Sequence, residues 1–194
     1  MTNNPLLAMT VTFTSRQMLQ IWRSCAGLEP LSADCTIERF DGVDVDSRLS
    51  ELMRQWYLAL LDEGDPRLIG QPCDASSLVS LKAAAGDWSA TVVCEPSVRR
   101  LCAIRLSEWH REVPVVERSE IAHLLPFQAN PFSRAGVCDP IAWRNPDGSV
   151  HAIPSTASSR VTAASAVVDP GEDSFRLDTR ALSTINDYLS HHFL

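Results

Sequence analysis

The residues best suited to nucleophilic chemistry in this sequence are its six cysteines and five histidines. A thiolate nucleophile needs a base within hydrogen-bond distance, and a neutral imidazole can supply one. Cys94 with His110 or His123 is the pairing that would form such a catalytic pair. No G-x-S-x-G motif and no motif typical of a catalytic cysteine accompanies it. Core cysteines and surface histidines are therefore the simpler interpretation, and we expect no catalytic residue.

Metal and cofactor chemistry has only weak candidates. Glu108, His110 and Glu112 would share one face of a strand, and His191 and His192 close the last apolar pattern. An ordinary solvated face explains the first group, and cations at a helix C-terminus explain the second. The cysteines form no C-x-x-C pair, and no Walker A or G-x-G-x-x-G sequence is present. We therefore expect no metal and no cofactor.

Composition and charge exclude several classes of protein. The chain has 194 residues, 45% of them hydrophobic and 21% charged, which is close to the average of globular proteins and unlike disordered or fibrous chains. A formal net charge of -7 provides no positive field for a phosphate backbone. We expect no direct sequence-specific nucleic-acid binding. Because no apolar run is long enough to cross a bilayer, we expect no membrane partner either.

Helical periodicity is clearest near the start of the chain. Thr14 and Ser15 are typical of a helix N-cap, and the helix that follows them should end before Gly27. A second helix should begin after Asp44 and end before Gly64, since its apolar residues recur at spacings of three and four. These residues are Val45, Leu49, Leu52, Met53, Trp56, Tyr57 and Leu60.

The middle of the chain favours strands and turns. Alternation, β-branched residues and turn residues predict strands at 78–81, 88–94, 113–116, 141–143, 150–153 and 160–168, and a weaker one at 35–40. The first two should form a hairpin. The segment 101–109 fits either a strand or a helix by periodicity, and we favour a strand. The sequence Asn145-Pro146-Asp147-Gly148 predicts a type I turn between two strands of a second hairpin.

These elements predict an α+β fold in a single domain over 1–194. Its helical N-terminal part should span about 14–66 and its β-rich part about 77–168. A C-terminal helix over about 178–193 should begin at Asp178 and pack on a central antiparallel sheet.

The segment Pro126–Arg134 has neither helical nor strand periodicity and is rich in proline and aromatic residues. We expect an ordered loop or an extended arm, because proline lowers the entropy lost when such a segment is fixed. Aromatic residues and arginine are enriched at protein interfaces, although many aromatic residues simply lie in the core. The predicted interface residues are Phe127, Asn130, Pro131, Phe132, Arg134, Trp143 and Arg144.

Two stretches resemble virion proteins of tailed bacteriophages, in particular those of Bacteroidales phages and prophages. The stretch Pro96–Val113 contains the pattern R-L-x-x-x-R-L-x-x-W followed by a charged turn and a proline. The stretch Leu125–Pro154 contains an Asn-Pro-Phe arm, a strand that begins with proline and a hairpin. Together they cover about a quarter of the chain. The segment Arg160–Val168 departs from the pattern, because it lacks an aromatic and basic ending, and the first ninety residues match nothing in it.

The resemblance implies a connector or ring protein between head and tail, without an active site. Its expected partners are other virion proteins, namely the portal or neighbouring connector or tail subunits, and copies of itself in a homo-oligomeric ring. It would be made in the cytoplasm of the bacterial host and would end up in the virion. A small cytoplasmic bacterial hydrolase that uses a Cys-His pair is the alternative, and a host adaptor domain with one protein partner is a third possibility.

Overall fold

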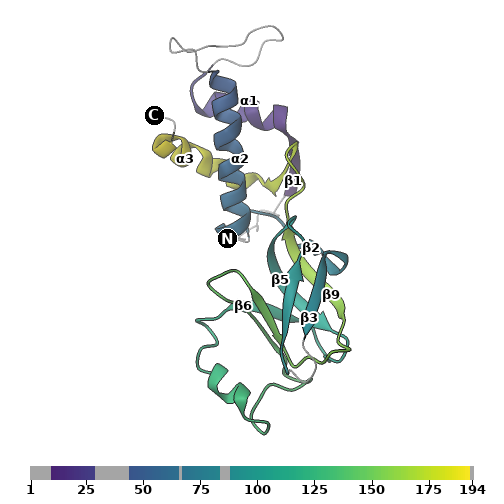
Figure 1. Cartoon of the computed structure of the whole chain (residues 1–194). Coiled ribbons are helices and arrows are strands. Elements are labelled where there is room, and N and C mark those ends of the chain that lie inside the picture. The colour runs from purple at the N-terminus through teal and green to yellow at the C-terminus, as the bar shows by residue number, and fades with distance from the viewer. Residues whose placement is uncertain (1–9, 29–43, 66, 84–87, 193–194) are drawn as a thin grey trace, which may run out of the picture. The chain divides into compact units, whose positions relative to one another are not determined.

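The computed structural model describes residues 10–28, 44–65, 67–83 and 88–192, and Figure 1 shows its helices and strands. The fold is a mixed α and β fold, as the sequence predicted. The weak strand expected at 35–40 lies outside the described residues. Within them, no helix is both long and apolar enough to cross a membrane.

Contacts divide the chain into two compact units, where the sequence led us to expect one domain. The residues up to Gln71 and those from Asp169 onward form the first, which we call the helical unit. Pro72–Val168 form the second, which we call the sheet unit. The last part of the chain belongs to the helical unit because its strand pairs with the first strand of the chain. This long-range pairing is the feature that a local sequence pattern does not show.

The helical unit contains a two-stranded antiparallel sheet and helices from both ends of the chain. Its elements are β1 (Thr10–Thr14), α1 (Ser15–Cys25), α2 (Val45–Glu63), β10 (Ser174–Asp178), the 3-10 helix η3 (Thr179–Thr184) and α3 (Ile185–His192). The two predicted N-terminal helices are confirmed. Thr14 and Gln17 form a capping box at the start of α1, and Asp44 caps α2.

The core of the helical unit is built from aromatic side chains. The rings of Trp22 on α1 and Trp56 on α2 meet edge to face with centroids 5.8 Å apart. Tyr188 on α3 lies 6.1 Å from Trp22 by the same measure, and the Trp56 indole donates a 3.1 Å hydrogen bond to Thr184. The C-terminal helix therefore packs against α1 and α2. The expectation that it packs on the central sheet is wrong, because the β1–β10 pairing brings it to the N-terminal helices.

The sheet unit is one eight-stranded sheet in the order β2-β9-β5-β6-β7-β8-β4-β3. Its elements are β2 (Cys73–Asp74), η1 (Ser76–Leu78), β3 (Val79–Ala83), β4 (Ala90–Cys94), β5 (Val98–Leu106), β6 (Val113–Glu117), η2 (Leu125–Ala129), β7 (Ile141–Arg144), β8 (Val150–Ile153) and β9 (Val161–Val168). The β3–β4 and β7–β8 hairpins are confirmed as antiparallel pairs. Pairing is antiparallel between all neighbours in this sheet except β6 and β7, which run parallel.

The parallel pairing of β6 with β7 accounts for the long connection that contains the proline-rich segment. Adjacent parallel strands cannot be joined by a tight turn, so the chain needs a long crossover between them. Residues 118–140 make that crossover from β6 to β7, and they include η2 and the proline-rich segment. The core of the sheet unit contains Trp109, whose buried indole donates a 2.8 Å hydrogen bond to the carbonyl of Pro154.

Candidate protein-interaction site

The predicted arm is an ordered, hydrogen-bonded loop. We use the name arm for Leu125–Arg134. Its first half is the 3-10 helix η2 (Leu125–Ala129), so the expectation of a segment without helical structure, made for Pro126–Arg134, is wrong for residues 126–129. Its second half turns on Asn130, whose side-chain oxygen accepts from the Phe132 amide at 2.9 Å and whose carbonyl accepts from the Arg134 amide at 3.0 Å.

Two contacts with Trp88 attach the end of the arm and the residue after it near the start of β4, and a third closes the connection on itself. The Gln128 side-chain oxygen accepts from the Ala135 amide at 2.8 Å, and the Trp88 indole donates to the Ala135 carbonyl at 3.1 Å. The Arg134 guanidinium carbon lies 3.6 Å from the Trp88 ring centroid, within the range of a cation–π contact. Trp88 lies two residues before β4, which pairs with β8, so the end of the arm is attached beside the sheet.

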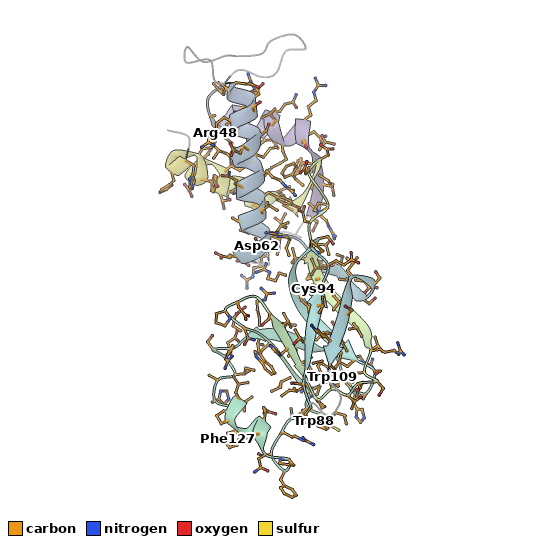
Figure 2. All side chains as sticks on the ribbon, in the orientation of Figure 1. Arg48, Asp62, Trp88, Cys94, Trp109 and Phe127 are labelled. Atoms are coloured by element: carbon orange, nitrogen blue, oxygen red, sulfur yellow. The ribbon has the colours of Figure 1, made fainter. Side chains whose placement is uncertain are left out.

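Two phenylalanines of the arm point into solvent. Phe132 is 98% exposed and Phe127 is 54% exposed, and Figure 2 shows Phe127 at the surface of η2. Apolar side chains of this size are mostly buried in monomeric proteins, and exposed ones that cluster mark interaction sites. The arm therefore holds two large apolar groups in water on a backbone that is already ordered.

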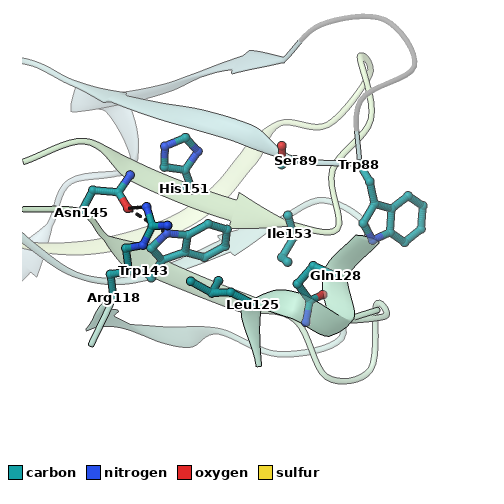
Figure 3. Close-up of a pocket in the computed structure, with 9 residues that line it drawn as sticks. All are labelled: Trp88, Ser89, Arg118, Leu125, Gln128, Trp143, Asn145, His151 and Ile153. Carbon is teal, nitrogen blue, oxygen red and sulfur yellow. Dashed lines mark hydrogen bonds between the residues drawn. The ribbon is translucent and has the colours of Figure 1, made fainter. Parts of the chain in front are cut away.

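A pocket of about 330 Å³ opens between the arm and strands β7 and β8 (Figure 3). Leu125 and Gln128 of η2 form one wall, and Trp143 and Asn145, at the end of β7, form another. The remaining lining residues are Trp88, Ser89, Arg118, His151 and Ile153.

Hydrogen bonds fix the polar end of this pocket. The buried Asn145 accepts from the Arg118 guanidinium at 3.1 Å and from the Trp143 indole at 3.2 Å, and its amide donates to Ser149 at 2.9 Å. The Trp143 and His151 rings stack with centroids 5.3 Å apart and planes 17° from parallel. The pocket is therefore shaped before any partner arrives.

The structure brings six of the seven predicted interface residues to this region. The five arm residues lie together, and Trp143 lines the pocket beside the arm. Arg144, which follows Trp143 on β7, points to the other face of the strand and donates to the Leu101 carbonyl at 3.3 Å. Sequence reasoning missed Trp88, Arg118 and His151, since each comes from a different strand or connection, and no local spacing marks them as neighbours.

The cysteines and histidines are arranged differently from the pairing that the sequence suggested. Burial raises the pKa of the Cys94 thiol, although the charge of Arg144 opposes this effect. The exposed Cys138 instead places its sulfur 3.6 Å from Nδ1 of His110. Among the described residues, the structure thus gives His110 a cysteine partner that the sequence did not single out.

The acidic and histidine residues of the alternating segment do not converge on a metal site. Glu108 accepts from the Ser159 hydroxyl, and Glu112 accepts from Ser165 at 3.2 Å. His110 contacts Cys138. Over the part of the chain that the structure describes, no group of three histidine, cysteine or acidic residues could hold a metal ion.

Comparison of the sequence with protein-family models finds no match, and comparison with curated proteins also finds none. Function is therefore inferred from the arm, the pocket and the motifs of the sequence.

Proposed function

We propose that this chain is a structural virion protein of a tailed phage, a connector or adaptor subunit at the head–tail or neck region that acts by protein–protein assembly. The single observation that carries the proposal is Phe132, 98% exposed on an arm that is hydrogen-bonded and attached to the sheet. The resemblance of Pro96–Val113 and Leu125–Pro154 to phage virion proteins supports the head–tail connector as the kind of assembly.

The energetics of the arm favour binding. Burying a phenylalanine side chain against a partner contributes roughly 1.5–3 kcal/mol, and two lie on this arm. Because Asn130, Gln128 and Trp88 already order the backbone, less conformational entropy is lost when a partner covers it. Exposed aromatic residues on a rigid platform are typical of the residues that dominate binding energy at interfaces.

The proposed partners are the portal or neighbouring connector or tail subunits, and copies of this chain in a ring. A ring needs a contact between different surfaces of successive copies. The arm is a protruding surface of the kind that such a contact uses. No catalytic, metal or cofactor residue enters this proposal.

The test is incorporation of a Phe132→Ala variant into particles made by a phage whose own copy of the gene carries the substitution. We expect the variant to fold as the wild type does, because the removed side chain contacts little of its own chain, and to be lost from density-banded particles. Val93→Ala is the matched control, since Val93 is 46% exposed on β4 and lies outside the arm. Incorporation of both variants at the wild-type ratio would contradict the proposal.

A second candidate, the small bacterial hydrolase, is favoured by one observation only, the 3.6 Å contact between Cys138 and His110. A cysteine beside an imidazole is the arrangement that activates a thiol nucleophile. This candidate requires one thiol with a depressed pKa and a rate of alkylation that depends on His110. The assembly proposal requires neither.

A further inference from the structure

The pocket beside the arm has a polar end and an apolar end (Figure 3). Arg118, Asn145 and His151 lie at the polar end, together with the edge of the Trp143 ring. Leu125, Ile153 and Trp88 supply the apolar surface. A ligand that fills it must therefore carry an apolar group and, beside it, a group that accepts hydrogen bonds.

The donors at the polar end are not saturated within the part of the chain that the structure describes. Among the described residues, the exposed Arg118 guanidinium donates one side-chain hydrogen bond, to the neutral amide of Asn145, and has no carboxylate within salt-bridge distance. The ring nitrogens of His151 have no hydrogen-bond partner among these residues. A guanidinium has five N–H donors in a planar fork, so Arg118 retains donors for a second acceptor.

Two acidic residues near the pocket in sequence, Glu120 and Asp147, accept hydrogen bonds from neighbouring groups, and Asp147 also interacts with the charge of His151. Glu120 accepts from the Glu117 amide at 3.1 Å, and Asp147 accepts from the Ser149 hydroxyl and amide. Among the described residues, no carboxylate lies within salt-bridge distance of Arg118, so a carboxylate of a partner can pair with it. A carboxylate is the acceptor that fits a guanidinium fork best.

We propose that this pocket binds a carboxylate side chain of the assembly partner, with an adjacent aromatic or aliphatic side chain seated between Trp88, Leu125 and Ile153. The inference rests on the proposed function, because it names what the partner presents to the arm's surface. Charge complementarity with Arg118 carries it, and the pocket volume of about 330 Å³ suits an occupant of this size. The carboxylate accepts from Arg118, and the apolar group displaces water from the indole and aliphatic walls.

The test uses two blocked dipeptides, acetyl-Glu-Phe-amide and acetyl-Gln-Phe-amide, titrated into the full chain labelled with ¹⁵N. The indole N–H resonances of Trp88 and Trp143 report binding directly. We expect the glutamate peptide to bind roughly fivefold more tightly than its glutamine counterpart, the gain that a partly exposed charge-assisted contact gives. Arg118→Gln should remove this preference. Arg111→Gln, which changes an exposed arginine paired with Asp139 away from the pocket, should retain it.

Equal affinity for both peptides, absence of indole shifts at peptide concentrations up to about 20 mM, or an unchanged preference in Arg118→Gln would each overturn the inference. Failure here is separable from failure of the proposed function. If Phe132→Ala is lost from particles while the peptides show no preference, the arm is the assembly surface and the pocket is not its carboxylate site. If Phe132→Ala is incorporated normally while the peptides bind as expected, carboxylate binding in the pocket is supported and the assembly role of the arm is contradicted.

Discussion

The guanidinium of Arg134 lies over the ring of Trp88, 3.6 Å from its centroid. This contact joins the end of the arm, in the connection from β6 to β7, to a residue two positions before β4. A cation–π contact of this kind contributes roughly 0.5–2 kcal/mol. Together with the hydrogen bonds of Gln128 and Trp88 to Ala135, it accounts for an ordered arm without a buried core of its own.

Replacement of Trp88 should loosen the arm without unfolding the sheet. Trp88→Ala removes the ring beneath Arg134 and the donor to Ala135. The free energy of opening the arm should therefore fall by about 1–2 kcal/mol, which raises the amide exchange rates of the arm roughly tenfold. Hydrogen exchange of residues 126–135 measures this effect, with strands β5 and β9 as the internal reference. Unchanged exchange in the arm would show that Trp88 does not hold it.

The sequence predicted the elements that depend on local patterns and missed those that depend on distant partners. The turn at Asn145–Gly148 has a proline and a glycine where a type I turn requires them, and Gly148 adopts φ 83°. The apolar stripe of Val45–Glu63 likewise determines its helix by itself. The pairing of β1 with β10 has no such local basis, since the threonines of β1 alternate with only two apolar residues.

Of the candidate site, the sequence predicted the arm but not the pocket. The composition of the arm predicted an interface, and the structure shows that its two phenylalanines are exposed. The pocket was not predicted because its walls come from η2, β7, β8, the residue after β6 and the two residues before β4, which meet only after the crossover forms. Arg144 was predicted together with Trp143, and the structure places it on the opposite side of β7 from the pocket, because neighbours on a strand face opposite sides.

Trp109 should be a determinant of stability in the sheet unit. Its indole is 1% exposed and donates to the Pro154 carbonyl at 2.8 Å. Trp109→Phe leaves that carbonyl without its donor and leaves a small cavity, which together should cost about 2–4 kcal/mol. Hydrogen exchange of the slowest amides of β5 and β8 measures the loss, and the amides of α2 in the helical unit serve as the control. Equal losses in both units would indicate that they unfold together.

The stability of the helical unit should fall in alkali because of Tyr57. Burial raises the pKa of its phenol to about 12, and its hydroxyl accepts from the Arg176 amide and donates to the Arg176 carbonyl. In the unfolded chain the phenol loses its proton near pH 10, so the contribution of Tyr57 to the free energy of unfolding is fully present below that pH. It is lost between pH 10 and 12, by roughly 2–3 kcal/mol in total.

Tyr57→Phe tests this assignment. The variant should be less stable at neutral pH by about 1–3 kcal/mol, because the Arg176 backbone loses both partners. Its free energy of unfolding should then fall less steeply than that of the wild type above pH 10, as measured by urea denaturation at several pH values. Parallel curves for the two proteins would exclude Tyr57 as the group responsible.

Thiol alkylation separates assembly from catalysis. Burial raises the pKa of Cys25, Cys94 and Cys102, so these thiols should react slowly with iodoacetamide at pH 7, whereas the exposed Cys138 should react first. We expect Cys138 to react at the rate of an ordinary exposed thiol, and His110→Ala to leave that rate unchanged. The assay uses a chain in which Cys35 is replaced by serine, with peptide mass spectrometry at each site. A rate at Cys138 that falls about tenfold or more in His110→Ala would favour the hydrolase.

The most direct test of the assembly proposal is mass spectrometry of density-banded particles from the culture that produces this protein. A connector subunit should copurify with a capsid protein in a fixed ratio that survives a second gradient. Absence of its peptides from clean particles would contradict a structural virion role, and the Cys138–His110 pair would then be the first site to investigate.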